Sequence, residues 1–282
     1  MADSQHYQQL IEDGYCVVEN VLSSDFLARL RVVTDTMIDA VPTEEARIRR
    51  STGSMISVSQ DVELVDLIAH STALDALKSM GLEDCRFQSG YVISKPPGGP
   101  RLFWHFDWGG WSHPISFKKR PAQIFLMYYL TDTSPHNGCL RVIPGSHLHE
   151  NPLHSLLAQA HTEDLDQADD LSRIEFQTYA DEIDLPVHAG DLVLGDSRLL
   201  HAAHANQSSH RRTVITLWFQ PFYAELPEEI KSYSASRAFS IPPEWPTEAR
   251  NRLEHLLVYA KNGIEPAPFS RDYYRPDGKP IC

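Results

Sequence analysis

The chain has 282 residues, of which 42% are hydrophobic, 22% charged and 10% aromatic, and its formal net charge is −13. These values are typical of globular proteins and exclude a disordered or low-complexity chain. The negative charge argues against a nucleic-acid partner, because such partners select a basic face. No apolar stretch reaches the roughly 18 residues that span a bilayer, and residues 1–13 lack the features of a signal peptide. We therefore expect a single cytoplasmic domain over residues 1–282, with no membrane partner.

The first part of the chain predicts a strand followed by helices. Residues 15–22 are rich in β-branched side chains, which favour a strand. Ser23 can cap the helix that follows, because apolar residues recur at helical spacing from Phe26 to Ile38. A second helix is expected near residues 62–79, ending before Gly81. The helical N-terminal part therefore covers about residues 23–82.

From Arg86 onward, short apolar runs alternate with turn residues. The runs cover residues 90–94, 123–130, 139–143, 191–194, 198–203 and 213–219. Many short strands separated by Gly, Pro, Asn and Asp indicate a sandwich or barrel, here with a core of about residues 86–222. Residues 161–184 are acidic and should form a partly helical excursion, and a last helix is expected over residues 246–262. The predicted fold class is mainly β with flanking helices.

The cysteines and histidines carry different signals. Cys16, Cys85, Cys139 and Cys282 show neither C-x-x-C spacing nor a disulfide framework, so we expect free thiols in a reducing compartment. The 14 histidines are more unusual, because histidine is the commonest metal ligand in proteins. The histidines are therefore the first candidates for a functional site.

His105-x-Asp107 is the first candidate metal motif. Residues two apart in a strand point to the same face, so His105 and Asp107 would offer an imidazole and a carboxylate side by side. Two histidines and one carboxylate on one face of a metal, with open positions opposite, suit non-haem Fe(II). Trp108 and Trp111 follow in a Gly-rich loop, where they could pack in the core or line a substrate mouth.

His201 is the predicted third ligand, because it follows an apolar strand and lies far enough along the chain to return beside His105. A hairpin centred near residues 206–207 would place Arg212 directly opposite His201. The planar guanidinium of Arg212 could then grip a dicarboxylate with two parallel hydrogen bonds.

Three competing readings concern other histidines. His161-Thr162-Glu163 is another H-x-acid pattern, but we interpret it as part of a solvated helix. His204 and His210 are interpreted as solvent-facing loop residues. A zinc site at His201-x-x-His204 lacks a suitably spaced glutamate and a helical setting.

These motifs resemble the phytanoyl-CoA dioxygenase family of Fe(II)- and 2-oxoglutarate-dependent oxygenases. Besides His105-x-Asp107, the matching segments are Asn137-Gly138-Cys139-Leu140-Arg141-Val142-Ile143-Pro144-Gly145-Ser146-His147, then Gly190-Asp191, and His201 with Asn206 and Arg212 downstream. The surroundings of His105, with Trp111, and the pair Gln88-Ser89 are similar to ectoine hydroxylases. The resemblance covers about residues 10–225.

The resemblance implies a double-stranded β-helix, a cupin-like core with jelly-roll topology. It implies that His105, Asp107 and His201 bind Fe(II) and that Arg212 pairs with the 5-carboxylate of 2-oxoglutarate. Gln88 is a further candidate contact for cosubstrate or substrate. The implied reaction uses O2 and oxidises a small organic molecule, such as a natural-product intermediate, releasing succinate and CO2.

Two departures from the family patterns limit this expectation. Ala202-Ala203 replaces a frequent Gly-Ser pair, and Ser112-His113-Pro114 does not continue the ectoine-hydroxylase motif, which argues against ectoine as substrate. The presence of Asp107 favours oxygenation over halogenation. The alternative is a cupin-like metal-binding protein or inactive binding module that does not use 2-oxoglutarate, but the complete ligand set with Arg212 favours the enzyme. The sequence indicates no particular substrate or oligomeric state.

Overall fold

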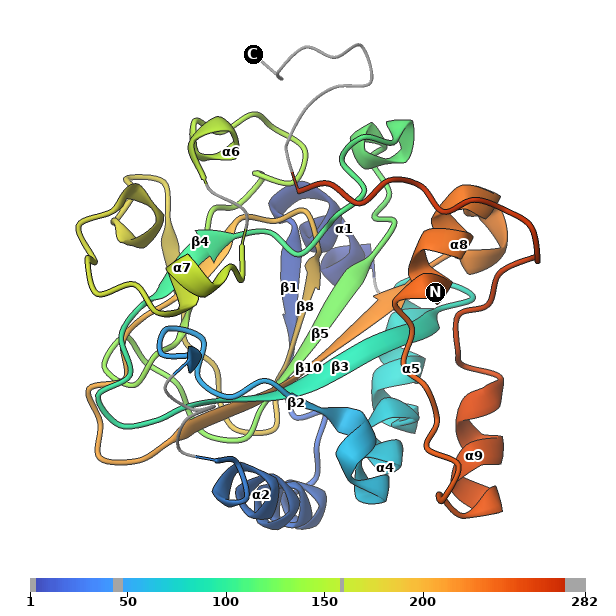
Figure 1. Ribbon diagram of the computed structural model, residues 1–282, viewed down its shortest axis with the longest axis horizontal. Coiled ribbons are helices and arrows are strands. Elements are labelled where there is room, and N and C mark those ends of the chain that lie inside the picture. Colours follow the sequence, from blue (N-terminus) through green and yellow to red (C-terminus); the bar gives the residue numbers. More distant parts are fainter. Residues whose placement is uncertain (1–3, 43–47, 158–159, 272–282) are drawn as a thin grey trace.

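The computed structural model describes residues 4–42, 48–157 and 160–271, and it consists of two antiparallel β-sheets with helices outside them (Figure 1). The larger sheet has six strands in the order β1-β8-β5-β10-β3-β2, and the smaller has four in the order β4-β9-β6-β7. The expected mainly β fold with flanking helices and a jelly-roll core is confirmed. No helix within the described ranges is long and apolar enough to cross a membrane.

The strands take up most of the predicted apolar runs. They are β1 (Tyr15–Val18), β2 (Ile56–Ser57), β3 (Arg86–Lys95), β4 (Leu102–His105), β5 (Ile124–Tyr129), β6 (Leu140–Val142), β7 (Ile183–Leu185), β8 (Leu192–Asp196), β9 (His201–Ala203) and β10 (Arg212–Gln220). The helices are α1 (Ser4–Asp13), α2 (Ser24–Asp39), α4 (Val65–Ile68), α5 (Ser71–Ser79), α6 (Leu153–Leu156), α7 (Glu163–Asp166), α8 (Glu228–Ser236) and α9 (Thr247–Glu254).

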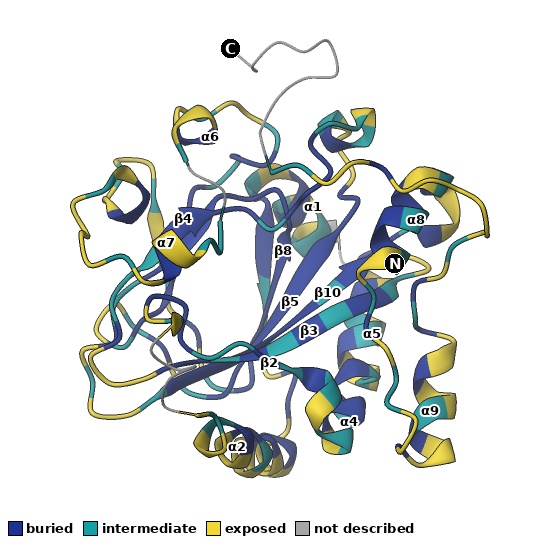
Figure 2. Ribbon diagram, in the orientation of Figure 1, coloured by how far each residue is buried: buried dark blue, intermediate teal, exposed yellow. Residues whose placement is uncertain are grey.

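Helix α2 shows how the helices attach to the larger sheet. Ser23 is its N-cap, as predicted, and its hydroxyl accepts a hydrogen bond from the Phe26 amide at 3.3 Å. The buried face of α2, including Phe26 and Leu30, joins one apolar cluster with α4, α5, α9 and the outward side chains of the six-stranded sheet. Figure 2 shows these helices buried on the side that faces the sheet and exposed on the other. The helices therefore stiffen the outer wall of the barrel and leave its interior to the site.

Two predicted helices have different lengths in the structure. The helix expected over residues 62–79 is divided, because His70 adopts an extended conformation and starts α5 anew. The last helix ends at Glu254 instead of continuing to residue 262. Its continuation bonds to the edge of β3, where the Phe87 amide donates to the Leu256 carbonyl at 2.6 Å and the Val258 amide donates to the Phe87 carbonyl at 3.1 Å. Helices α1 and α8 were not predicted.

The hairpin expected around residues 206–207 is wrong. Strand β9 lies in the smaller sheet, whereas β10 lies in the larger one, where Arg212 is paired with Lys95. The connection therefore crosses from one sheet to the other, and the Asn206 amide fixes it by donating to the carbonyls of Lys95 at 3.0 Å and His210 at 2.8 Å. A tight two-residue turn would have paired β9 directly with β10. The longer connection allows the two strands to join different sheets.

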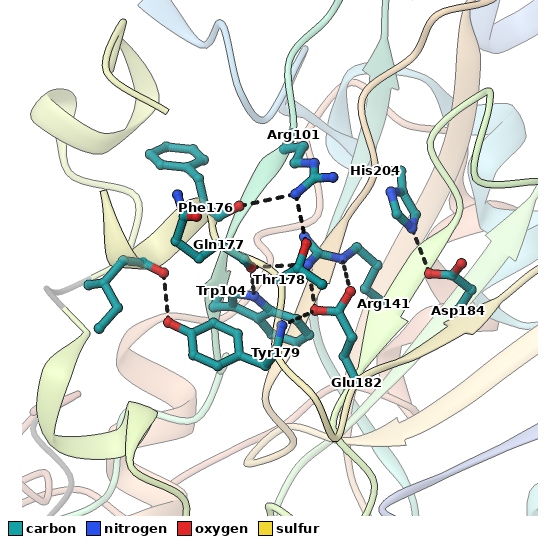
Figure 3. A network of polar contacts seen from close by, with 11 residues as sticks. Arg101, Trp104, Arg141, Phe176, Gln177, Thr178, Tyr179, Glu182, Asp184 and His204 are labelled. Carbon is teal, nitrogen blue, oxygen red and sulfur yellow. Dashed lines mark hydrogen bonds and ion pairs between the residues drawn. The ribbon is translucent and has the colours of Figure 1, made fainter. Parts of the chain in front are cut away.

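The acidic excursion expected over residues 161–184 belongs to a longer connection, residues 143–182, which leaves the smaller sheet between β6 and β7, and residues 183–184 already lie in β7. Side chains anchor the return of this connection (Figure 3). Arg141 of β6 binds both carboxylate oxygens of Glu182, at 3.1 and 2.5 Å. The Gln177 carbonyl accepts hydrogen bonds from the Trp104 indole at 2.9 Å and from Arg141 at 3.0 Å. We call residues 143–182 the excursion from here on.

Candidate metal centre

The structure brings His105, Asp107 and His201 together at one end of the smaller sheet. Strand β4 ends at His105, which is paired in register with His201 of β9, and their ring centroids lie 4.1 Å apart. One carboxylate oxygen of Asp107 lies 3.7 Å from His105 Nε2, and the other lies 3.9 Å from His201 Nε2. Their side chains are 4%, 8% and 2% exposed for His105, Asp107 and His201, so the cluster is shielded from bulk water.

Backbone and side-chain hydrogen bonds orient all three groups. The Nδ1 atoms of His105 and His201 each lie 3.0 Å from a carbonyl oxygen, of Phe103 and Leu199 respectively. Since a carbonyl only accepts, Nδ1 carries the proton in both rings and Nε2 presents its lone pair toward Asp107. The Trp218 indole donates to Asp107 at 2.9 Å. This donor set fits a divalent metal, and its supporting contacts are those that metal-binding histidines and carboxylates commonly have.

Burial keeps His105 in its metal-binding form. Desolvation lowers the pKa of His105 well below its usual value, and the neighbouring His201 and His161 lower it further. A neutral imidazole is the form that binds a metal, so protons do not compete for His105 Nε2 near neutral pH.

His161 lies beside this cluster, and its assignment to a solvated helix is wrong. Thr162 caps α7 by accepting from the Leu165 amide at 3.3 Å, so His161 precedes the helix instead of lying in it. The His161 ring stands edge-on to His105 at 5.0 Å and to Phe103 at 5.3 Å. Burial, with smaller effects of Arg271 and His201, lowers the pKa of His161 to about 3. The capping pattern Thr162-x-x-Leu165 was the sequence signal that could have placed it correctly.

Arg212 lies on the interior face of β10 and is 4% exposed. Its guanidinium stands 5.8 Å from the centre of the Tyr129 ring, its Nε atom is buried without a hydrogen-bond partner, and burial lowers its pKa. Arg211 points the opposite way, toward α2, where it binds Asp39 at 2.7 Å. In the part of the chain that the structure describes, no carboxylate lies within ion-pair distance of Arg212. A buried cation with an unused donor is prepared for an anionic ligand.

Gln88 lies apart from Arg212, at the other end of β3. Its side-chain oxygen accepts hydrogen bonds from Gln123, at 2.5 Å, and from Gln220. Seven residues of strand, about 23 Å, separate Gln88 from Lys95, the register partner of Arg212. Gln88 is instead close in sequence to Ser89, which is paired with Trp218. The structure therefore places Gln88 near the Trp218 end of β3 and away from Arg212.

The tryptophans near the motif belong to the core. Trp104, Trp108 and Trp111 are each 1% exposed, and the Trp108 indole donates to the Ser116 hydroxyl at 2.7 Å. They therefore support the loop after Asp107 instead of lining an open mouth. The C-terminal segment covers this loop, because the Ser270 amide donates to the Gly109 carbonyl at 2.8 Å.

His204, His210 and the described cysteines lie outside the metal cluster. His204 is half-buried and lies 2.6 Å from Asp184, so it is not a free loop histidine, and it does not share a ligand cluster with His201 (Figure 3). His210 is exposed, as expected. Cys85 and Cys139 are thiols, and Cys282 lies outside the described residues.

Comparisons with known proteins identify a family and a shared fold. The family profile "Phytanoyl-CoA dioxygenase (PhyH)" matches residues 10–214. An ectoine dioxygenase from Nocardia farcinica is 25% identical over 261 residues, which cover 83% of this chain and 86% of that protein. The non-heme alpha ketoglutarate dependent epimerase SnoN from nogalamycin biosynthesis aligns with a TM-score of 0.58 and 17% identity, over 77% of this chain and 80% of SnoN. HygX from Streptomyces hygroscopicus, solved with nickel and 2-oxoglutarate bound, aligns with a TM-score of 0.60 and 16% identity, over 77% of this chain and 86% of HygX.

Proposed function

Because the chain belongs to the phytanoyl-CoA dioxygenase family, whose members are Fe(II)- and 2-oxoglutarate-dependent enzymes, we propose that it oxidises a small organic molecule at the cluster of His105, Asp107 and His201. The observation that carries this proposal is that the Nε2 atoms of His105 and His201 both lie next to the buried carboxylate of Asp107. They are 3.7 and 3.9 Å from its two oxygen atoms. Two imidazoles and one carboxylate with open positions are the set that non-haem Fe(II) oxygenases use.

The three side chains would hold the iron, and the rest of the site would orient the reactants. Bound there, iron supplies the chemistry by which O2 and 2-oxoglutarate give succinate, CO2 and an oxidised substrate. Trp218 keeps the Asp107 carboxylate in place, and the Phe103 and Leu199 carbonyls keep both imidazoles in the required tautomer. Phe125, whose ring lies 5.2 Å from the ring of His201, helps to exclude water.

Arg212 would bind the distal carboxylate of 2-oxoglutarate. It shares the interior face of β10 with Trp218, since the two residues are an even number of positions apart. Strand β10 would therefore present the Arg212 guanidinium to the distal end of 2-oxoglutarate, and it presents the Trp218 indole to the Asp107 carboxylate. The Nε atom of Arg212 is buried without a hydrogen-bond partner and would donate to the distal carboxylate of 2-oxoglutarate.

The substrate belongs to the class of small polar organic molecules, including natural-product intermediates. The fold neighbours include SnoN, from nogalamycin biosynthesis, and the sequence relatives include an ectoine dioxygenase. The departure of Ser112-His113-Pro114 from the ectoine-hydroxylase motif argues against ectoine itself. Gln88, with Gln123 and Gln220, would offer amide groups to a polar substrate on the Trp218 side.

We also infer that residues 1–282 act as one domain. Strand β1, near the start of the chain, pairs with β8, and residues 256–258, near its end, bond to β3. Segments from the first and last parts of the described chain are thus bonded to the larger sheet.

The experiment is a screen for succinate formed from 2-oxoglutarate by the iron-loaded protein, against a panel of small metabolites. We expect succinate above the background without substrate for at least one compound, and loss of the signal in His105→Ala. A protein that binds iron but neither binds 2-oxoglutarate nor forms succinate with any compound would instead be the cupin-like metal-binding alternative.

A further inference from the structure

A third imidazole reaches the metal cluster from outside the two sheets. One ligand atom from each of His105, Asp107 and His161 lies within 4.8 Å of the others. His161 comes from the excursion, whereas His105 and His201 come from paired strands. The family resemblance assigns no role to this residue.

The local structure holds His161 in this place at a cost. Its φ is 57°, in the left-handed region that residues other than glycine rarely adopt. Such conformations persist only where the surroundings enforce them, and they concentrate at functional sites. The ring is packed edge-on against Phe103, and Arg271 donates to the adjacent Ala160 carbonyl at 2.8 Å. The position of the His161 ring is therefore a built feature of the excursion.

One ring nitrogen of His161 is not used by the described part of the protein. Its Nδ1 atom is buried and has no hydrogen-bond partner in the structure. A buried polar atom without a partner costs about 1–3 kcal/mol, so a ligand that satisfies the ring offsets part of that cost. The other described groups around the ring are His105, His201, the Phe103 ring and the cationic side chains of Arg271 and Arg49.

The spacing is close to what direct coordination requires. Ligand atoms about 2.1 Å from a metal lie about 4.2 Å apart when they are on opposite sides of it. One ligand atom from each of His105, Asp107 and His161 lies within 4.8 Å of the other two, so small side-chain rotations can bring all three to one metal.

We propose that His161 is a fourth protein ligand of the metal when 2-oxoglutarate is absent, and that the cosubstrate displaces it. This inference rests on the proposed function. The facial set of His105, Asp107 and His201 leaves three of six positions open. Bidentate 2-oxoglutarate and O2 would together fill all three, so His161 must leave the metal before both can bind. While it is bound, His161 would occupy one of the three positions that the reactants need.

The test measures Co²⁺ binding to the full-length apoprotein by calorimetry, with the cobalt absorption spectrum as a second readout. The main variant is His161→Asn, because Asn tolerates a positive φ better than most residues. Without 2-oxoglutarate, we expect this variant to bind Co²⁺ about 10-fold or more weakly, since even the loss of a supporting partner costs about 10- to 100-fold. With saturating 2-oxoglutarate, the two proteins should bind Co²⁺ equally well.

Thermodynamic linkage adds a second expectation. Since the cosubstrate must displace His161 in the wild type, the Co²⁺-loaded variant should bind 2-oxoglutarate more tightly, by the same factor by which it loses Co²⁺ affinity. A residue that only supports the fold would not tighten cosubstrate binding when it is removed.

Thr162→Ala is the matched control, because it removes the cap of α7 but leaves the imidazole. It should keep the wild-type affinity and spectrum. Equal Co²⁺ affinity of His161→Asn and the wild type without 2-oxoglutarate would overturn the inference, and so would an equal loss in Thr162→Ala. If the wild type binds Co²⁺ but no 2-oxoglutarate, the proposed function fails, while the comparison without cosubstrate still decides whether His161 is a ligand.

Discussion

The paired strands and the segments that cover them build different parts of the site. His105, His201 and Arg212 lie on strands whose neighbours are fixed by backbone register. The excursion is anchored by side chains, such as Arg141 on Glu182, and the C-terminal segment by single hydrogen bonds, such as that from the Ser270 amide to the Gly109 carbonyl. On the proposed function, the strands would fix the metal and cosubstrate positions, whereas the covering segments could change with the substrate. Four predictions test this division.

The largest effect is expected from Asp107→Ala. This change removes one ligand and its charge, so iron binding should fall sharply and hydroxylation should be lost. Metal content and succinate formation are the measurements. The assignment would be wrong if the variant kept full turnover, or if its iron were held by His161 and Glu163 alone.

The anchor of the excursion is tested by Glu182→Ala. Arg141 is fully buried, so removing its carboxylate leaves an uncompensated charge, which typically costs about 3–5 kcal/mol. We expect faster proteolysis within residues 150–182 and a lower free energy of unfolding, with iron still bound by the strands. The control Asp164→Ala breaks the exposed pair with Arg173 and should cost less than about 1 kcal/mol. Equal effects of the two variants would show that the buried pair is no anchor.

The cosubstrate end is tested by Arg212→Ala. A charge-assisted hydrogen bond contributes roughly 1.5–3 kcal/mol, so the 2-oxoglutarate requirement should rise about 10- to 150-fold while iron still binds. Arg212→Lys should rescue only partly, because lysine lacks the planar fork. Arg211→Ala is the control and should change little, because its side chain binds α2. Titration of 2-oxoglutarate in the succinate assay measures the requirement of all three variants. A larger increase in Arg211→Ala than in Arg212→Ala would contradict the assignment.

The smallest effect is an acid sensitivity of the excursion. Burial lowers the pKa of His154, on α6, to about 4 from its usual 6.5. The unfolded chain takes up this proton at higher pH than the folded one, so the contribution to stability is present above pH 6.5 and is lost as the pH falls toward 4. At pH 5 the loss should be on the order of 1–2 kcal/mol. Urea unfolding of His154→Asn, which keeps an acceptor for the Asn151 amide, should show a shallower pH dependence. Parallel curves for the two proteins would contradict this reading.

The same division explains what could be predicted from the sequence. The proximity of His105, Asp107 and His201 was predicted from the H-x-D motif and the returning strand, although Asp107 lies just beyond the end of β4 and is therefore not placed by strand alternation. The opposition of His201 and Arg212 was wrong, because residue spacing cannot distinguish a hairpin from a crossover between two sheets. His161 was set aside because an acidic surrounding predicts solvent exposure, whereas tertiary packing against Phe103 buries this ring. The α9 boundary was missed because the competing bonds to Phe87 come from a distant strand.

Strand β10 links the two ends of the reaction centre in one rigid element. Arg212 stands at its start, and Trp218 donates to Asp107 six residues later. Deleting or inserting a single residue between them would turn one of the two side chains out of the barrel. During divergence, this strand can therefore accept substitutions but not changes in length, whereas the excursion can change in length away from His161 and Glu182. New substrate preferences can then arise from changes in the excursion, while the strands that hold Arg212 and Trp218 stay the same.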